Sequence, residues 1–450
     1  MDRIEQKIID IIDQNAEKII AFGDDIWHHA ELGYQEHRTS EKFCEVLDEL
    51  NLSYEKNLAV TGVKSYLKDK TEGEVRIALM GEMDALPIAD HVDANPETGA
   101  AHCCGHDAQI TGVMGAALAL TDPEIKAALG GNIVFFGVPS EEATTAPEVK
   151  DRMIEEGLIK YLGGKCELIR NGNVDDIDMT VGHHVKQEYS IANRTSMGFM
   201  EKYVTYHGTA AHPAYICNAV DAGAAASLAM HAVDVQREAI NRWRYYNTHI
   251  LHGFVKNGGN VANIVADKTE LDYNIRAKTL EDMMDIAYRV DRAFKGAAVA
   301  TGAGMEIKTV PGYMPVVPIK DEDWAFEIFD LIDPAHKKPV FHPGPDYLEG
   351  TTDYGDLSCI MPVMQFLTGG AGGVAHNKSF TREDLYEYYV VPAKCFALSA
   401  YRLLKDDAAL AKQIIANNKP MMTKDEYLNM MESISKVETM DMVPVPKDLV

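Results

Sequence analysis

The chain has 450 residues, of which 46% are hydrophobic and 25% charged, a composition typical of a soluble globular protein with room for more than one core. Its 43 Lys and Arg stand against 69 Asp and Glu, so the formal net charge is −26, which disfavours binding to nucleic acids or anionic membrane surfaces. The acidic helical pattern of residues 1–14 fits neither a signal nor a transit peptide. Seven irregularly spaced cysteines indicate free thiols, so we expect a cytoplasmic protein.

After an amphipathic helical start, short and nearly continuous apolar runs alternate with helical segments. Each run has a polar, glycine-marked or proline-marked exit, which is typical of a buried strand in an α/β sheet. The runs are Val75–Met80, Asn132–Val138, Asp178–Val181 and Val363–Leu367. We therefore predict the α/β fold class, with a central mixed sheet flanked by helices, and functional residues in the loops that follow the strands.

Residues 197–309 have a different pattern and are predicted to form an inserted α+β domain. Its elements follow the order β-α-β-β-α-β over Phe199–Tyr206, Asn218–Glu238, Thr248–Val255, Thr269–Lys278, Leu280–Thr301 and Met305–Val310. The α/β pattern resumes after Pro311, so residues 1–196 and 310–450 are assigned to one discontinuous domain. The tail from Lys405 is expected to be helical, then rich in proline and acidic residues, and peripheral.

Residue types that can bind metal ions follow the ends of all four predicted strands. A His or Glu at a single strand end is usually a structural or surface residue. Four exits that each offer a thiolate, an imidazole or a carboxylate favour a borderline divalent cation such as zinc or manganese. The segments are Gly81–Pro87 with His102–Asp107, then Val138–Glu142, Val181–Val185 and Ala375–Asn377.

In this order, the segments resemble the motifs of the M20 metallopeptidase clan. Asp25–Glu36 resembles the amino-terminal H-x-x-PEL-x-x-x-E signature, with Ala30 in place of the proline. The match continues over residues 20 to 400 through Gly81–Pro87, His102–Asp107, Pro139–Glu142, Gly208–Pro213, Gly258–Val265, Asn274–Arg276, Thr351–Ser358 and His376. The Cys-Gly-His-Asp segment is typical of the amidohydrolase branch, which includes aminoacylases and hippurate hydrolase-like enzymes. The Gly-Gly-Lys165 segment and Gly172–Asp178 resemble aminobenzoyl-glutamate hydrolases in particular.

The resemblance implies a catalytic domain with two divalent cations, zinc or manganese. The implied ligands are Cys104, His106, Glu142, His184 and His376. A thiolate can bridge two cations. Glu141 takes the position of the general base, since of two adjacent carboxylates one can bind metal while the other faces the attacking water. Asp84 and Asp107 are interpreted as partners that orient a ligating imidazole.

The same resemblance makes the inserted domain a lid and dimerisation domain that supplies the substrate side. His212 matches the histidine that polarises the scissile carbonyl, commonly across a dimer interface. Asn263 and Arg276 match residues that hold the carboxylate of the substrate, for which an arginine fork is a natural partner. We therefore expect a homodimer, with a small N-acyl or N-aroyl amino acid as substrate.

The chain also departs from the pattern of the family. Gln109 stands where a histidine is frequent, and Pro213 stands where an alanine is usual and could shift the loop that carries His212. Cys103 is an extra thiol beside the implied ligand, and we interpret it as a packing residue. His183 precedes a ligand position and is interpreted as structural.

Four functions can be weighed on the sequence. The favoured one is a metal-dependent amidohydrolase that cleaves N-acyl or N-aroyl amino acids. A metallo-dipeptidase or carboxypeptidase is the alternative, weakened by the absence of His-x-Asp at Glu82–Asp84. A cysteine hydrolase based on Cys104 would leave the histidines and the Glu-Glu pair unexplained. A binding protein without activity would give Glu141 no role.

Overall fold

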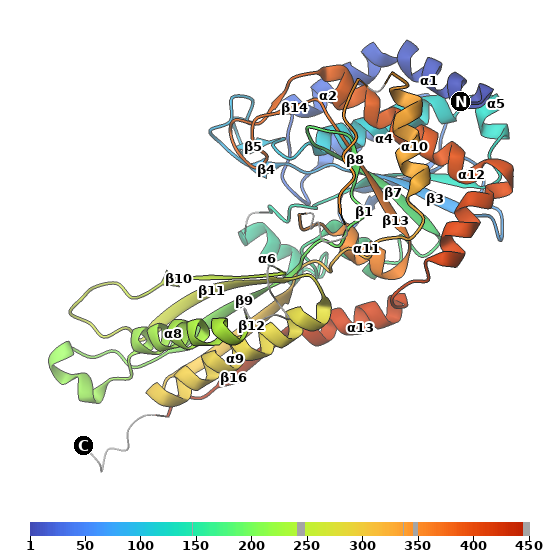
Figure 1. The fold of residues 1–450 in the computed structure, drawn as a ribbon. Helices are drawn as coiled ribbons and strands as arrows, with labels where there is room; N and C mark the ends of the chain where they lie inside the picture. Colours follow the sequence, from blue (N-terminus) through green and yellow to red (C-terminus); the bar gives the residue numbers. More distant parts are fainter. Residues whose placement is uncertain (146, 241–247, 336, 345–349, 444–450) are drawn as a thin grey trace. The chain divides into compact units, whose positions relative to one another are not determined.

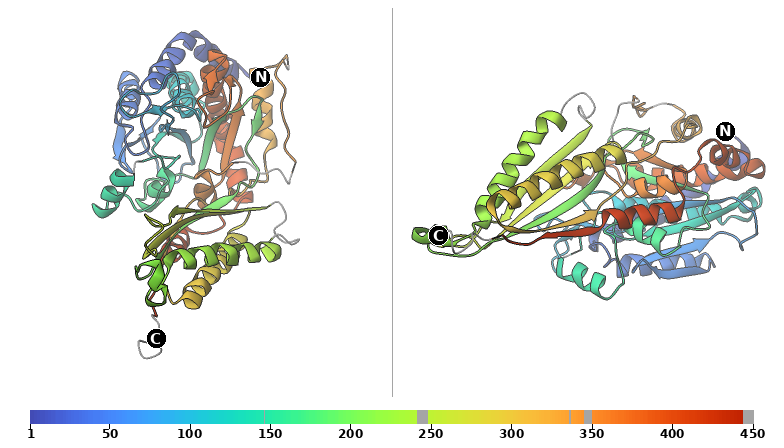
Figure 2. Two further views of the ribbon diagram at one scale, coloured as in Figure 1. Left: turned by 90° about the vertical axis from the view of Figure 1, so that its left-hand side faces the viewer. Right: turned by 90° about the horizontal axis from the view of Figure 1, so that it is seen from below.

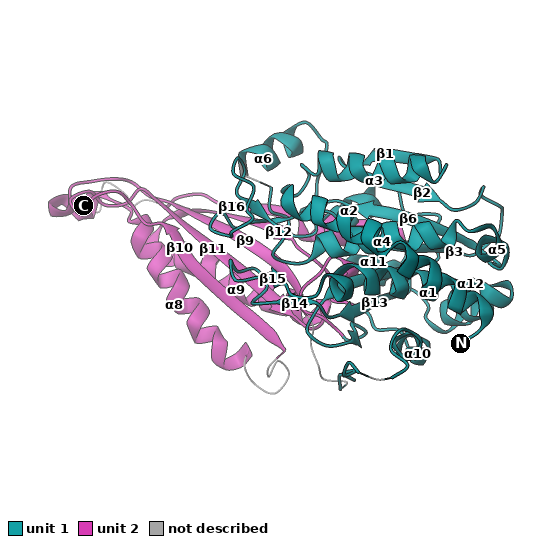
Figure 3. Ribbon diagram, turned by 90° about the horizontal axis from the view of Figure 1, so that it is seen from above, with its two compact units in different colours: residues 1–194, 317–347, 356–423 teal, residues 195–316, 348–355, 424–450 magenta. Residues whose placement is uncertain are grey.

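The computed structural model describes residues 1–145, 147–240, 248–335, 337–344 and 350–443. The chain divides into two compact units, coloured separately in Figure 3. Unit 1 comprises residues 1–194, 317–347 and 356–423, and unit 2 comprises residues 195–316, 348–355 and 424–450. The breaks lie close to the ends of the expected insertion at residues 197 and 309. The end of the chain, however, groups with unit 2 and not with the first domain as we expected.

Unit 1 is built on a seven-stranded mixed sheet with the order β1-β2-β6-β3-β7-β13-β8 (Figure 1). Four adjacent strands run parallel, and these are the four apolar runs of the sequence: β6 (Asn132–Val138), β3 (Arg76–Glu82), β7 (Met179–Val185) and β13 (Val363–Thr368). The antiparallel strands at the two sides are β1 (Tyr54–Leu58), β2 (Gly62–Tyr66) and β8 (Ser190–Ile191). The predicted α/β fold class is confirmed.

Helix α4 (His106–Leu120) lies at the centre of unit 1 and packs against β3 and against α12 (Val391–Asn417). It is almost entirely buried, because its small residues let neighbouring segments approach closely. A side chain at Gly115, for example, would lie 2.6 Å from Ala393 of α12. The remaining helices of the unit are α1 (Arg3–Gln14), α2 (Ala16–His28), α3 (His37–Glu49), α5 (Pro123–Ala127), α6 (Pro147–Glu155), α7 (Gly164–Arg170), α10 (Asp323–Ile332), all but the first two residues of α11 (Tyr354–Ile360), and the π-helical turn η2 (Tyr386–Val390).

Two short hairpins complete unit 1. Strands β4 (Leu86–Pro87) and β5 (Ala100–Ala101) pair between β3 and α4, and β14 (Ala371–Gly372) pairs with β15 (Thr381–Arg382) after β13. Among the described residues, no helix combines the length and the apolar character needed to cross a membrane.

Unit 2 contains a five-stranded antiparallel sheet with the order β10-β11-β9-β12-β16. Helices α8 (Ala222–Ile240) and α9 (Leu280–Thr301) lie side by side on one face of it (Figures 1 and 2). Strands β9 (Gly198–His207) and β11 (Lys268–Ala277) alternate buried and half-buried residues, as expected when one sheet face packs on helices. With β10 (His249–Asn257) and β12 (Gly304–Pro311), every element of the predicted β-α-β-β-α-β order is present; the 3₁₀ turn η1 (Pro213–Asn218) precedes α8.

The tail of the chain is not peripheral, contrary to our expectation. Helix α13 (Lys424–Ile434) buries Tyr427 and Met431, and strand β16 (Lys436–Met440) pairs with β12 from Met305 to Thr309. The strand therefore covers the β12 edge of the sheet and leaves β10 as the other edge. Hydrogen bonding to a strand that lies more than a hundred residues earlier leaves no local signal in the sequence.

Replacing Met431 with alanine tests whether the tail is part of the core. Met431 is fully buried, and truncation of a buried methionine costs about 2–5 kcal/mol, so Met431→Ala is expected to lower the free energy of unfolding by that amount. Met421→Ala is the control, because its exposed side chain is expected to contribute less than about 0.5 kcal/mol. Urea unfolding followed by circular dichroism measures both. Equal effects of the two substitutions would show that the tail packs weakly.

Candidate active site

The carboxyl ends of the four parallel strands carry the candidate ligands of unit 1. Glu141 and Glu142 follow β6, His184 lies near the end of β7, and His376 lies in the loop after β13. Cys104 and His106 flank the start of α4, which follows β3. Because parallel strands end at one edge of a sheet, segments far apart in the sequence meet there.

The ligand atoms of these residues form two groups that share one sulfur. The first group is Cys104, His106 and His184, and the second is Cys104, Glu142 and His376; within each, all ligand atoms lie within 4.8 Å of one another. The Cys104 sulfur lies 3.2 Å from His184 Nε2, and Glu142 Oε1 lies 3.0 Å from His376 Nε2. The structure thus brings together all five ligands that the resemblance implied, in an arrangement that could hold two cations.

Electrostatics keep Glu142 and His184 in forms that bind cations. Although burial by itself raises it, the imidazoles of His376 and His106 bring the pKa of Glu142 down to about 2, so this carboxylate is ionised. Burial, together with the nearby His106, lowers the pKa of His184 and favours the neutral imidazole. Carboxylates and neutral imidazoles are the forms that donate lone pairs to a metal ion.

The neighbours His183 and His184 point to opposite faces of β7, because side chains alternate along a strand. His183 is fully buried, and its Nε2 lies 2.8 Å from the hydroxyl of Thr368 on the adjacent strand. Burial lowers the pKa of His183 well below its usual value. The structure therefore places His183 outside both groups of ligand atoms, in keeping with the structural role inferred for it.

Cys103 and Cys104 likewise face different surroundings. The Cys103 side chain is buried in the hydrophobic core, and burial raises the pKa of its thiol to about 12. Its carbonyl oxygen accepts a hydrogen bond from the backbone N–H of His376 at 2.8 Å and so ties the loop of that ligand to the segment before α4. Gly105, which follows Cys104, has φ = +93°, and a side chain there would lie 2.2 Å from Val185. Glycine is thus required between Cys104 and His106.

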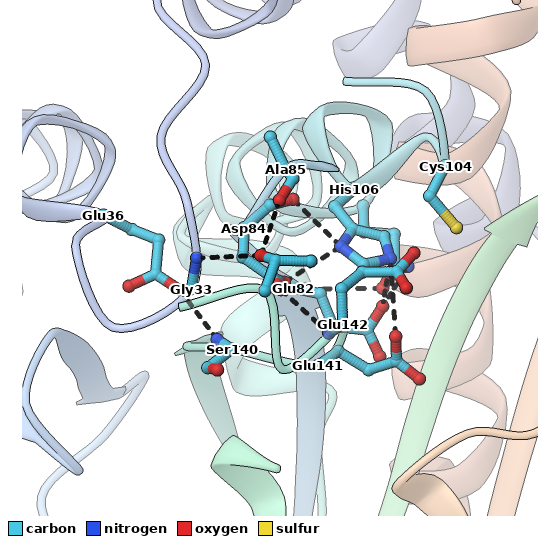
Figure 4. Close-up of polar contacts among 12 residues, drawn as sticks. Gly33, Glu36, Glu82, Asp84, Ala85, Cys104, His106, Ser140, Glu141 and Glu142 are labelled. Atoms are coloured by element: carbon cyan, nitrogen blue, oxygen red, sulfur yellow. Dashed lines mark hydrogen bonds and ion pairs between the residues drawn. The ribbon is translucent and has the colours of Figure 1, made fainter. Parts of the chain in front are cut away.

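Asp84 contacts the imidazole of His106, the residue that we predicted it to orient. Its carboxylate oxygen Oδ1 and its carbonyl oxygen each lie 3.0 Å from His106 Nδ1, while Oδ2 accepts a hydrogen bond from the Glu142 N–H at 2.8 Å (Figure 4). Two acceptors at Nδ1 favour a proton on that nitrogen, and the other nitrogen, Nε2, faces the other ligand atoms.

Asp107 does not orient an imidazole in the described structure. Its two oxygens accept hydrogen bonds from the hydroxyl groups of Tyr388 at 3.0 Å and Tyr389 at 2.7 Å. Consecutive residues of a helix point about 100° apart, so Asp107 cannot share the direction of His106. Burial, only partly offset by the tyrosine hydroxyls, raises the pKa of Asp107 to about 6. The carboxylate anchors η2 to α4.

A strained turn presents Glu141 to the ligand cluster. Ser140 has φ = +45°, unusual for a residue with a side chain, and its N–H donates to Glu36 Oε1 at 2.7 Å while its carbonyl accepts from the Gly164 N–H at 2.9 Å. Glu141 Oε2 lies 3.9 Å from His106 Nε2. The turn therefore separates Glu141 from Glu142, which belongs to the group around His376.

Sequence reasoning missed Glu82 as a member of the cluster. With His106 and Glu141 it forms a third group of ligand atoms within 4.8 Å of one another, and its Oε2 lies 3.1 Å from His106 Nε2. Its carboxylate also binds the Lys165 ammonium at 2.5 Å and the Gln109 amide at 2.6 Å. Two features of the sequence could have indicated it, the unusual Gln109 and the Gly-Gly-Lys165 segment, but neither was connected with Glu82.

The three residues expected on the substrate side all lie in unit 2. His212 Nδ1 accepts the Ala214 N–H at 3.1 Å and caps η1, and Asn263 is exposed. Arg276 donates to Thr351 at 3.0 Å and to Asn274 at 2.9 Å, and its guanidinium lies over the ring of Phe199. Each of the three side chains is thus described within its own unit, and the structure leaves their roles toward substrate as predictions.

Comparisons with known proteins identify the family of the chain. The model of peptidase family M20/M25/M40 matches residues 78–396. A human Xaa-Arg dipeptidase is 25% identical over 464 residues, which cover 96% of both chains. One of the subunits of p-aminobenzoyl-glutamate hydrolase from Escherichia coli (strain K12) is 25% identical over 326 residues, 70% of this chain and 63% of that one. A dinuclear metal-binding M20 peptidase of Bacillus subtilis shares the fold, with a TM-score of 0.64 at 20% identity over 87% of this chain and 99% of that one.

Substituting the two adjacent cysteines tests the shared sulfur. Because the Cys104 sulfur belongs to both groups of ligand atoms, Cys104→Ala is expected to lose bound zinc or manganese, whereas Cys103→Ala keeps it because that thiol lies in the core. Elemental analysis of the two purified variants gives the metal content per chain. Equal metal content in both would show that Cys104 is not a ligand.

Proposed function

The chain belongs to peptidase family M20/M25/M40 and is a hydrolase of amide bonds, and from this premise we propose that it uses two divalent cations to release an amino acid from an N-acyl or N-aroyl conjugate. The observation that carries the proposal is the sulfur of Cys104, shared by two groups of ligand atoms. The seven free cysteines support the expected cytoplasmic, reducing location.

The donor atoms fit two borderline cations, zinc or manganese. One cation would be held by Cys104, His106 and His184, and the other by Cys104, Glu142 and His376. Nε2 of His106 is buried without a hydrogen-bond partner among the described residues, as expected of an atom that binds a cation. When bound, the cations polarise the scissile carbonyl and acidify the attacking water.

Glu141 is proposed as the general base. Its carboxylate belongs to neither of the two groups that hold the cations, yet it lies 3.9 Å from the Nε2 of His106 and is only 7% exposed. From there it can accept the proton of the attacking water and return a proton to the leaving amine. The turn at Ser140 fixes this position, since hydrogen bonds hold the Ser140 N–H and carbonyl on both sides.

The substrate is proposed to carry a carboxylate, which Asn263 and Arg276 would bind. A guanidinium with several N–H groups suits a carboxylate better than a single ammonium does. Such a local cation allows an anionic substrate to bind to a protein of net charge −26. His212 would polarise the scissile carbonyl, as the resemblance implies.

A second candidate function is the hydrolysis of dipeptides, which the similarity to the human Xaa-Arg dipeptidase over 96% of both chains favours. Matched substrates separate the two functions: an N-acetyl or N-benzoyl amino acid against a dipeptide with the same carboxy-terminal residue. They differ at the amino-terminal side, where the dipeptide has an ammonium group. A higher kcat/KM for the acylated substrate would support the first function, and a higher value for the dipeptide would favour the second.

We also propose that two copies pair through the β10 edge of unit 2. Strand β10 ends the sheet on one side, and its Ile250, Phe254 and Val255 are about half exposed. Exposed apolar strand edges tend to pair with another chain, and a twofold arrangement closes such an edge.

The proposed base is tested by Glu141→Gln. The variant should keep its bound metal and lose about 10²–10⁴-fold in kcat, because the amide can no longer accept a proton. Elemental analysis and steady-state kinetics on the same preparation provide both values. Full activity of the metal-loaded variant would rule out Glu141 as the base.

The dimer is tested by mixing two inactive variants, His212→Ala and Glu141→Gln. If His212 serves the ligand cluster of the other copy, each mixed dimer has one intact site and one with both defects. Random exchange makes about half of the dimers mixed, so activity should recover to about a quarter of the wild-type value. No recovery after verified subunit exchange would mean that His212 acts in its own chain or that the protein does not dimerise.

A further inference from the structure

We propose that Glu82 is a sixth protein ligand, which binds the cation held by His106 and His184. The inference deepens the proposed function, since it rests on the presence of the two cations. Glu82 ends β3 and is buried, as are His106 and Lys165 around it. Figure 4 shows the side chains of Glu82, Glu141 and Glu142 converging on His106, while Glu36 lies apart beside Ser140.

The positions of the ligand atoms support this assignment. Glu82, His106 and Glu141 form a group whose ligand atoms all lie within 4.8 Å of one another. Glu82 Oε2 lies 3.1 Å from His106 Nε2, and this nitrogen has no hydrogen-bond partner among the described residues. Two oxygens of Asp84 lie 3.0 Å from Nδ1, so Nε2 is the nitrogen that remains for a cation. A cation between the two residues would be bound by Nε2 and Oε2 together.

The distance between the two ligand atoms also suits a shared cation. Two N or O ligands at about 2.0–2.2 Å from zinc, separated by an angle of about 90–110°, lie about 2.8–3.6 Å apart. The 3.1 Å between Glu82 Oε2 and His106 Nε2 falls in this range. It also matches the 3.0 Å between the ligand atoms of Glu142 and His376, which belong to the proposed second cation.

Hydrogen bonds and an ion pair also hold the Glu82 carboxylate in one position. Lys165 Nζ lies 2.5 Å from Oε1, and the Gln109 amide donates to Oε2 at 2.6 Å while its oxygen accepts the Glu82 N–H at 3.3 Å. A carboxylate has enough lone pairs to accept these bonds and bind a cation as well.

This arrangement explains why Gln109 and Lys165 lie beside Glu82. Lys165 is fully buried, and a buried ammonium near two divalent cations would be repelled unless an anion lay between them. Glu82 is that anion, with one oxygen toward Lys165 and the other toward His106. Gln109, in place of the histidine frequent in the family, fixes the rotation of the carboxylate. Lys165 and Gln109 are therefore positioning residues, and Glu82 is the ligand.

The experiment replaces the carboxylate by an isosteric amide, Glu82→Gln, and measures binding of cobalt and zinc. Competition with a chelator gives the affinity of each site, and the visible spectrum of bound Co²⁺ reports its ligands. The matched control is Glu167→Gln, a buried carboxylate that pairs with Arg170 and belongs to none of the groups of ligand atoms. Lys165→Met tests a positioning residue, and Glu82→Asp retains the charge if the amide variant does not fold.

Glu82→Gln is expected to lower the affinity for one of the two cations by about 100-fold or more and to change the Co²⁺ spectrum. Lys165→Met should lower the affinity for the same cation by about 10–100-fold, which is the usual effect of losing a group that orients a ligand. The Co²⁺ spectrum of this variant should change little. Glu167→Gln should leave both affinities and the spectrum as in the wild type. An unchanged spectrum in both Glu82 variants would overturn the inference, whatever their affinity. A wild-type protein that binds no cation would contradict the proposed function instead.

Discussion

The site depends on a cluster of buried donor atoms around His106 Nε2, which lies 3.1 Å from the carboxylate of Glu82 and 3.9 Å from that of Glu141. Charged and polar groups removed from water destabilise the fold unless they are paired, so their positions need support from the surrounding protein. Asp84 contacts the opposite nitrogen of His106, and Lys165 contacts Glu82. The proposed cations would bind to donor atoms that the folded chain already holds in place.

The sheet explains why such a cluster can exist. Four adjacent parallel strands, β6, β3, β7 and β13, end at the same edge, so ligands from distant segments meet without a long loop. The buried α4 begins at this edge with His106 as its first residue. Many functions occur on α/β sheets, so the sheet by itself does not indicate amide hydrolysis. The donor atoms at this edge and the family of the chain do.

The sequence allowed the strands and the inserted β-α-β-β-α-β order to be predicted, because apolar periodicity is a local property. The five candidate ligands came from the resemblance, which carries positions but no contacts. What could not be predicted depends on three-dimensional placement. The partner of Glu82 lies 83 residues away, the side chain of Asp107 is turned from His106 by the helix, and β16 pairs with a strand far earlier in the chain. None of these leaves a periodic signal.

Two cations are proposed to share the thiolate of Cys104, and anomalous X-ray scattering from crystals grown with zinc would locate both of them. We expect two anomalous peaks per chain, each about 2.3 Å from the sulfur of Cys104. One peak should contact His106 and His184, and the other Glu142 and His376. A single peak, or two peaks that do not share the Cys104 sulfur, would show that this thiolate does not bridge two cations.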